Sequence, residues 1–138
     1  MPYQFYEVSY VMARAPQKRL FAMDAVDGSL DLFEFPQLPS PQQLVTTETR
    51  NRVEPSLPTG AADKLLREKA LRVVFHQGFF KVCEASLKFV RLPDVVHLPY
   101  WLGFYSSSEI VRCRVMDAVR RRIEGAKASA FFEQWLAA

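Results

Sequence analysis

The four letters Met23-Asp24-Ala25-Val26 return unchanged as Met116-Asp117-Ala118-Val119. In both places the tetrapeptide follows an apolar run, a polar turn and a second apolar run, which is the pattern of a β-hairpin. We place the first turn at residues 15–18 and the second at residues 106–108, and we match Tyr10 with Tyr100 by assuming a longer second turn. Because an internal recurrence of this kind indicates a repeated structural unit, the sequence predicts two related hairpins.

The residues that follow the two tetrapeptides differ. Asp27-Gly28 favours a tight turn, so we expect a third strand at 30–35 and a small meander in the first copy. The second copy has arginines at 120–122 instead, and we expect its strand to continue to Ile123 and to break at Glu124-Gly125.

Two helices, a loop and a further strand complete the predicted elements. Five prolines in 36–58 favour an extended loop. A helix is expected over 59–78, because four apolar residues fall on one stripe: Leu66, Ala70, Val73 and Val74. Residues 79–92 favour a strand, or a strand and a turn, that Pro93-Asp94 ends. A final helix is indicated by the spacing of Ala128, Phe131, Phe132 and Trp135.

These elements predict an α+β fold in a single domain, 1–138. Its antiparallel sheet would be built from two related hairpin or meander units, and two helices would cover one face of that sheet. The first hairpin unit occupies 1–35, the proline-rich loop 36–58 and the first helix 59–78. The second hairpin unit and the C-terminal helix occupy 79–138.

Composition is typical of a folded chain rather than a disordered one. The chain has 138 residues, of which 49% are hydrophobic, and its formal net charge is +3. No apolar run approaches the roughly 20 residues that cross a bilayer, so we expect no membrane span. The N-terminal residues lack a secretory signal, and two cysteines in apolar surroundings suit a reducing compartment, so we expect a cytoplasmic location.

The stretch 23–30, Met-Asp-Ala-Val-Asp-Gly-Ser-Leu, resembles the strand, turn and strand signature of PepSY-type domains. It covers eight residues, and those domains are mostly extracytoplasmic. Since Asp and Gly suit such a turn in any fold, we assign no function from this resemblance.

A basic stripe is the most specific pointer to a ligand. If residues 111–123 form one strand, side chains alternate between its faces. Arg112, Arg114, Arg120 and Arg122 then share the outer face, where they could follow a phosphate backbone while neighbouring aromatic rings stack on bases. The apolar face would hold Val111, Cys113, Val115, Val119 and Ile123, with Arg121 pointing inward. The alternative is a solvated strand face whose arginines pair with nearby glutamates.

Catalytic and metal chemistry is weakly signalled. The possible soft ligands His76, Cys83, His97 and Cys113 lack the short spacing of a zinc site, so we expect no metal and no cofactor. A thiol enzyme would rest on Cys83 and His76. Asp24 and Asp117 could face one another as a carboxylate pair. The favoured interpretation makes each a strand-end residue that binds backbone N–H groups.

The aromatic residues decide the preferred function. Several apolar strands have apolar side chains on both faces, and no catalytic motif is present, which favours a non-catalytic binding or assembly domain that associates with a protein partner or with itself. The candidate interface consists of Tyr100, Trp101, Phe104, Phe131, Phe132 and Trp135. The alternatives are an RNA- or DNA-binding domain that uses the four arginines, and a small-molecule pocket or thiol enzyme.

Overall fold

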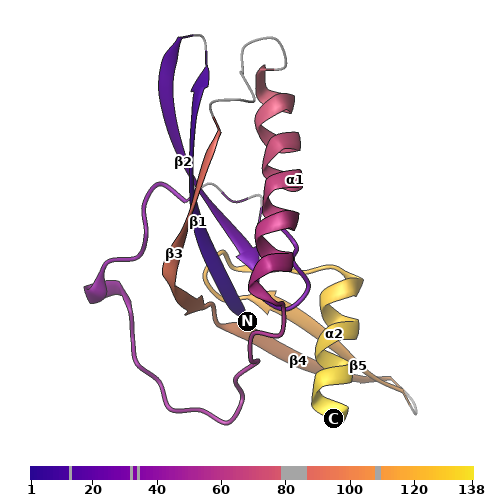
Figure 1. Cartoon of the computed structure of the whole chain (residues 1–138). Coiled ribbons are helices and arrows are strands. Elements are labelled where there is room, and N and C mark those ends of the chain that lie inside the picture. The colour runs from indigo at the N-terminus through magenta and orange to yellow at the C-terminus, as the bar shows by residue number, and fades with distance from the viewer. Residues whose placement is uncertain (13, 32, 34, 79–86, 108–109) are drawn as a thin grey trace. The chain divides into compact units, whose positions relative to one another are not determined.

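The computed structural model describes the chain except residues 13, 32, 34, 79–86 and 108–109 (Figure 1). It contains two compact units, Met1–Val96 (unit 1) and His97–Ala138 (unit 2). Each unit combines antiparallel strands with a helix, which confirms the α+β class. The hairpins lie in two three-stranded sheets, whereas we expected one sheet, and each helix belongs to its own unit.

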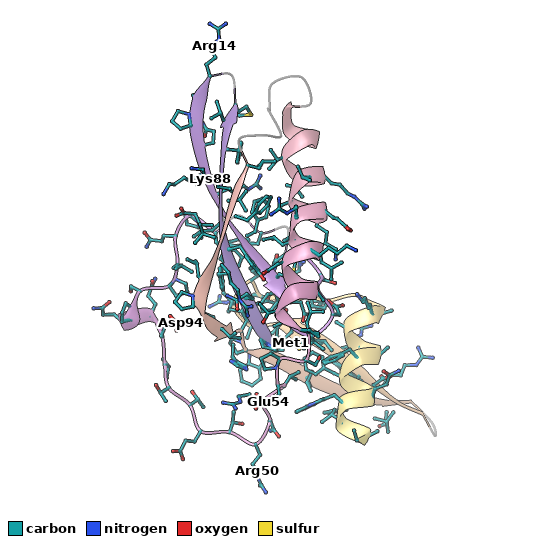
Figure 2. All side chains as sticks on the ribbon, in the orientation of Figure 1. Met1, Arg14, Arg50, Glu54, Lys88 and Asp94 are labelled. Atoms are coloured by element: carbon teal, nitrogen blue, oxygen red, sulfur yellow. The ribbon has the colours of Figure 1, made fainter. Side chains whose placement is uncertain are left out.

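The sheet of unit 1 has the strand order β2-β1-β3. Strand β1 (Pro2–Met12) pairs antiparallel with β2 (Ala15–Asp24), from Tyr3 opposite Asp24 to Met12 opposite Ala15. Arg14 stands at the tip of this hairpin with a φ of 68° (Figure 2). The predicted turn at 15–18 is therefore wrong, because those residues belong to β2. The register explains how Pro16 fits: it lies in a pair whose N–H groups point away from the partner strand.

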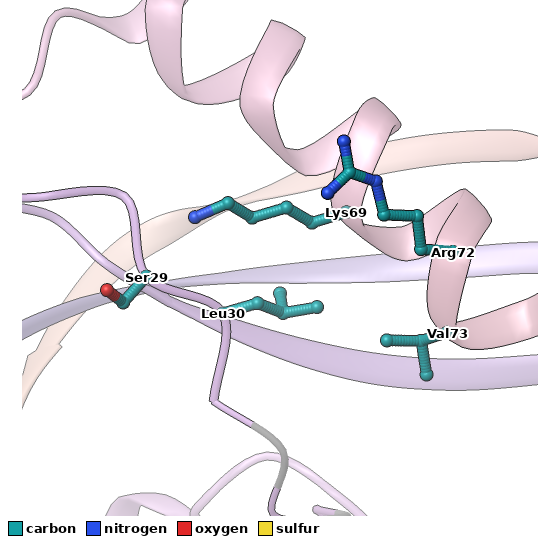
Figure 3. A pocket seen from close by; sticks show the side chains of 5 residues that line it. All are labelled: Ser29, Leu30, Lys69, Arg72 and Val73. Atoms are coloured by element: carbon teal, nitrogen blue, oxygen red, sulfur yellow. The ribbon is translucent and has the colours of Figure 1, made fainter.

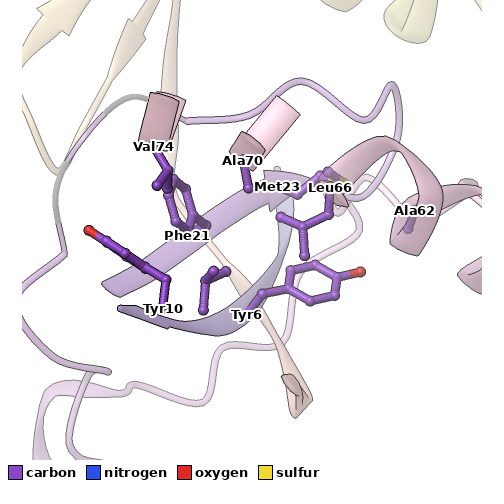
Figure 4. Close-up of a cluster of buried hydrophobic side chains, with 9 residues drawn as sticks. Tyr6, Tyr10, Phe21, Met23, Ala62, Leu66, Ala70 and Val74 are labelled. Carbon is purple, nitrogen blue, oxygen red and sulfur yellow. The ribbon is translucent and has the colours of Figure 1, made fainter. Parts of the chain in front are cut away.

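Helix α1 (Thr59–Gly78) follows the predicted bounds and packs on the hairpin of unit 1. Its buried stripe meets alternate side chains of β1 and β2, such as Tyr6 and Met23 (Figure 4). The buried members of this core are Tyr6, Val8, Tyr10, Phe21, Met23, Ala62, Leu66, Ala70 and Val74. Val73 is only partly buried beside them. Tyr6 also donates a hydrogen bond from its hydroxyl to Asp63 at 3.1 Å, which ties the start of α1 to β1.

The rest of unit 1 departs from expectation in two places. The predicted strand at 30–35 is represented by two isolated bridges, Leu20 to Phe35 and Met23 to Leu30, and the loop that follows holds only a short 3₁₀ turn, η1 (Pro41–Gln43). Of the strand predicted at 79–92, residues 79–86 lie outside the described residues. Strand β3 (Lys88–His97) continues through Pro93, where we expected the predicted strand to end. Because β3 is the outermost strand, a proline there need not remove a ladder hydrogen bond.

Unit 2 has the strand order β4-β5-β6 and the helix α2 (Ala126–Ala137). Strand β4 (Tyr100–Ser107) pairs antiparallel with β5 (Ile110–Asp117), and the short β6 (Arg122–Ile123) pairs with the end of β5. The predicted final helix is confirmed, with Phe132 buried. Among the described helices, none has both the length and the apolar character needed to cross a bilayer.

The recurring tetrapeptide forms the same turn in both units. Asp24 Oδ1 accepts hydrogen bonds from the N–H groups of residues 26 and 27, at 2.7 and 3.4 Å. Asp117 Oδ1 accepts them from residues 119 and 120, at 2.8 and 2.9 Å. These bonds confirm that each Asp is a strand-end residue that binds backbone. In each unit the methionine of the tetrapeptide pairs with the residue seven positions later: Met23 pairs with Leu30, and Met116 pairs with Ile123.

The same register corrects our alignment of the hairpins. Tyr3 lies opposite Asp24 and Tyr100 lies opposite Asp117, so Tyr100 corresponds to Tyr3 and not to Tyr10. The second hairpin is the shorter one. Strand β5 also ends at Asp117 instead of continuing to Ile123, because residues 118–121 form the turn. Arg121, expected to point inward, is exposed there.

Gly28 and Arg121 occupy equivalent positions of the two turns, with φ values of 74° and 54°. A Cβ on Gly28 would lie 2.6 Å from Leu65 Cδ1, so Gly28→Ala should lower the free energy of unfolding by roughly 1–2 kcal/mol. Arg121→Gly should raise it by about 0.5 kcal/mol, because glycine adopts positive φ without strain. Urea titrations of both variants test this, and a destabilising Arg121→Gly would contradict it.

Candidate functional site

The two faces of the unit 2 sheet differ in what covers them. Side chains directly opposite one another in an antiparallel pair share a face, so Cys113, Val115 and Asp117 lie on one face with the even-numbered residues of β4. Helix α2 packs on this face: the Phe132 ring lies 5.8 Å from that of Tyr100, and Glu133 Oε1 accepts a 3.0 Å hydrogen bond from the Cys113 N–H. All three β5 residues are accordingly buried.

The opposite face of the sheet carries aromatic and cationic side chains and is largely exposed. We call it the open face. Trp101 is 66% exposed and Tyr105 is 59% exposed, and the paired residues of β5 alternate with them along the hairpin. The open face consists of Trp101, Gly103, Tyr105, Arg112, Arg114, Met116 and Ile123. No carboxylate occupies any of these positions, so the described charge on this face is entirely positive.

One aromatic ring on the open face is held in place. Gly103 has no side chain, and a Cβ there would lie only 3.2 Å from the ring and hydroxyl of Tyr105, so the ring occupies the space that a larger residue would fill. The Arg114 guanidinium lies 5.7 Å from the centre of the same ring. This distance is within the range of a cation–π interaction. The open face therefore presents an arginine and a positioned aromatic ring next to each other.

Comparison of equivalent positions explains why this face is open. Met23 and Met116 occupy equivalent positions just before their turns. Helix α1 packs on the face of its sheet that contains Met23, whereas helix α2 packs on the face of its sheet that faces away from Met116. The chain reaches α1 through the long loop after Phe35 and reaches α2 directly after β6. Trp101 corresponds to Gln4, which is buried in unit 1.

The predicted basic stripe is divided between different environments. Arg112 and Arg114 share the open face. Arg120 instead folds back on the fully buried Asp117, with its Nε 2.5 Å from Oδ2 and a further ion pair through its terminal nitrogen. Arg122 lies opposite Asp117 in the register, away from the open face, and its guanidinium is 3.7 Å from Glu124. The alternation that we assumed fails because β5 ends before these two residues.

The predicted interface residues also separate into two groups. Trp101 and Phe104 are exposed, at 66% and 58%. Phe132 is buried in a cluster of aromatic rings that includes Tyr100, Phe131 and Trp135, and this cluster holds α2 on the sheet. Val111, Val119 and Ile123, which we expected to be buried, are exposed instead. Tyr105 joins the exposed group; its alternation with Trp101 along β4 was the signal that could have identified it.

Little in the described part of the chain favours catalysis or metal binding. Cys83 lies outside the described residues, as does the side chain of His76, so the thiol centre is not placed. No three described His, Cys, Asp or Glu residues gather as a metal site requires. Burial raises the pKa of the Cys113 thiol, with a smaller contribution from Glu133, which disfavours the reactive thiolate. Burial likewise raises the pKa of Asp24, while the N–H of Val26 lowers it.

A shallow depression of about 350 Å³ lies on unit 1 (Figure 3). Ser29 and Leu30 line it on one side, and Lys69, Arg72 and Val73 of α1 line it on the other. Lys69 donates a 2.6 Å hydrogen bond to the Gly28 carbonyl, so its ammonium group supports the turn. The lining residues include no histidine, cysteine or carboxylate, and the Lys69 ammonium is bonded to the Gly28 carbonyl, so this hollow does not support the pocket hypothesis.

The Asp117–Arg120 pair should be essential to the stability of unit 2. Arg120→Ala leaves a buried carboxylate without its cation and should lower the free energy of unfolding by about 3 kcal/mol. Arg122→Ala is the matched control in the same turn. Since its side chain is 66% exposed, its effect should stay within about 0.5 kcal/mol. Equal effects in urea titrations would contradict a structural role for Arg120.

No family model, curated protein or solved structure matches this chain. Its function is therefore inferred from the geometry of its own residues.

Proposed function

We propose that this chain is a non-catalytic assembly domain that associates with a second copy of itself through unit 2. The observation that carries the proposal is the concentration of exposed apolar side chains there. Seven of the thirteen exposed large apolar residues of the described chain belong to unit 2, although it is much the shorter unit: Trp101, Phe104, Tyr105, Val111, Val119, Ile123 and Leu136.

The type and arrangement of these residues support association. Six of the seven belong to the sheet or to its β5–β6 turn, so they form a patterned surface instead of being scattered over loops. Trp and Tyr are the residues most enriched in protein interfaces, because each contributes a large apolar area and one polar group. Exposed apolar side chains gathered on one sheet are a common mark of an interaction site.

Removing apolar area from β4 should weaken self-association. We expect the wild-type chain to show a concentration-dependent dimer in sedimentation velocity, and the double variant Trp101→Ser with Phe104→Ser to dimerise about tenfold or more weakly. The matched control is Leu44→Ser with Val45→Ser, which removes two exposed apolar side chains from the loop of unit 1 and should leave the dimer unchanged. A wild-type chain that remains monomeric throughout would refute the proposal.

Single-stranded nucleic acid is the second candidate ligand, and the open face favours it. Trp101 and Tyr105 lie on the same side of β4 as Arg112 and Arg114 of β5, with no acidic residue at the described positions of that face. Exposed aromatic rings on a sheet can stack on bases of any sequence, while arginines neutralise phosphates. Arg120 and Arg122 do not belong to this surface, so the candidate site is smaller than the one expected from the sequence.

Fluorescence anisotropy with a labelled oligouridine tests this second candidate. Replacing Arg112 and Arg114 by Ser should weaken binding and should reduce the slope of log affinity against log salt by about 0.7 for each arginine removed. The matched control replaces Arg50 and Arg72 by Ser; both are exposed in unit 1, and Arg50 projects from the loop (Figure 2). Equal losses in the two double variants would point to net charge alone and would eliminate the open face as the binding surface.

A further inference from the structure

The hydrogen bonds of unit 2 fix the direction of the backbone groups of β4. The Ala118 N–H bonds to the Pro99 carbonyl at 3.1 Å, so residues 99 and 118 form a hydrogen-bonded pair. Such pairs alternate along an antiparallel ladder, and the odd-numbered residues of β4 therefore bond to β5. The N–H and C=O groups of Leu102, Phe104 and Ser106 point the other way. Strand β4 is terminal in its sheet, and no other strand of the described chain pairs with that edge.

Other exposed strand edges of the described chain are protected against pairing. Beyond the two residues of β6, the edge of β5 is capped by Glu133, whose carboxylate accepts the Cys113 N–H. The two outer strands of unit 1 both carry a proline and charged residues: Pro16, Lys18 and Arg19 on β2, and Lys88, Arg91, Pro93 and Asp94 on β3. Charges and prolines on edge strands are the usual barriers to edge-to-edge association. Strand β4, Tyr-Trp-Leu-Gly-Phe-Tyr-Ser-Ser, has neither.

Unit 1 shows that the same hairpin edge accepts a further strand. Strand β1 corresponds to β4, since Tyr3 and Tyr100 occupy the same place in their registers. In unit 1 the outer edge of β1 is occupied by β3, and the Gln4 side chain donates a 2.5 Å hydrogen bond to the Leu92 carbonyl across that edge. A third strand therefore fits beside a hairpin of this geometry.

We propose that β4 pairs antiparallel with β4 of a second copy of this chain, around a two-fold axis at Phe104. This inference rests on the proposed assembly function and specifies its surface and partner. A second copy is the occupant that the charge pattern favours, because an uncharged strand meets its own copy without like-charge repulsion. With Phe104 opposite Phe104, Leu102 lies opposite Ser106, and the pairing adds roughly six backbone hydrogen bonds.

Pairing through this edge has a consequence for the rest of unit 2. The two sheets join into one six-stranded sheet, since each contributes β4, β5 and β6. Backbone pairing uses the edge of β4 and brings the side chains of the two β4 strands, including Trp101 and Phe104, beside those of the partner strand, while neither face of the sheet is covered from above. The two copies therefore present their open faces on the same joined sheet, related by the two-fold axis.

Opposite charges at the axis test the pairing. Phe104→Lys and Phe104→Glu each place like charges opposite one another, so each variant alone should dimerise about tenfold or more weakly than wild type. An equimolar mixture of the two should recover the dimer. Val45→Lys and Val45→Glu are the matched controls, because Val45 is 84% exposed in the loop of unit 1, outside the sheet that contains β4. Each control should dimerise like wild type.

Amide hydrogen exchange gives a second readout on the wild-type chain. On dimerisation the exchange rates of the Leu102, Phe104 and Ser106 amides should fall to about a tenth of the monomer value or below. The amides of Gly103 and Tyr105 already bond to β5, so their exchange rates should change little. A wild-type dimer without this alternation, or charged variants that still dimerise alone, would overturn edge pairing while the assembly function stands. A wild-type monomer would overturn both, and association only with an added oligouridine would assign the surface to nucleic acid.

Discussion

The turn organised by a strand-end aspartate is the constraint on which both units depend. In each unit one carboxylate oxygen accepts two backbone N–H groups of the turn, and the chain is returned to pair with the strand it has just left. This geometry needs a residue with positive φ, supplied by Gly28 in unit 1 and by Arg121 in unit 2. The second turn is further stabilised by Arg120, whose cation neutralises the buried Asp117.

The surface chemistry of unit 2 follows from which side of its hairpin the helix covers. Both hairpins have apolar residues on two faces, and a single helix can bury only one of them. In unit 1 the other face is also filled: the Phe35 ring lies 5.1 Å from that of Phe5, at the end of the segment that returns from the turn. Unit 2 passes from its turn directly into α2, and among the described residues no comparable segment of this unit covers Trp101 and Tyr105.

The sequence predicted those elements whose pattern is local. The stripe of α1, the aromatic spacing of α2 and the role of both aspartates were all visible in the chain, because helical periodicity and turn chemistry depend on residues close in sequence. The turn at 15–18 was wrong because Pro16 can sit in an outward-facing pair, which only the register reveals. Division into two sheets was likewise not visible, since strand pairing depends on long-range contacts.

The candidate site was predicted only in part, because the alternation of side chains holds within a strand and the strand ends earlier than we assumed. Alternation correctly placed Arg112 and Arg114 together, and it failed after Asp117, where a strand was assumed to continue. The arginines at 120–122 then serve the turn: one neutralises a buried carboxylate and one adopts positive φ. The sequence pattern therefore assigned four arginines to one surface, although the turn after Asp117 places Arg120 and Arg122 away from the open face.

Division of the arginines also separates the two binding modes that we propose for unit 2. Backbone groups at the edge of β4 are directed within the plane of the sheet, whereas Arg112, Arg114 and the rings beside them project from its open face. The proposed pairing through the edge and the proposed binding on the face would therefore use different atoms and would not compete. Joining two copies through β4 would double the positive open face, and because neutralised phosphates contribute cumulatively to affinity, such a dimer would hold a nucleic acid strand more tightly than one copy does.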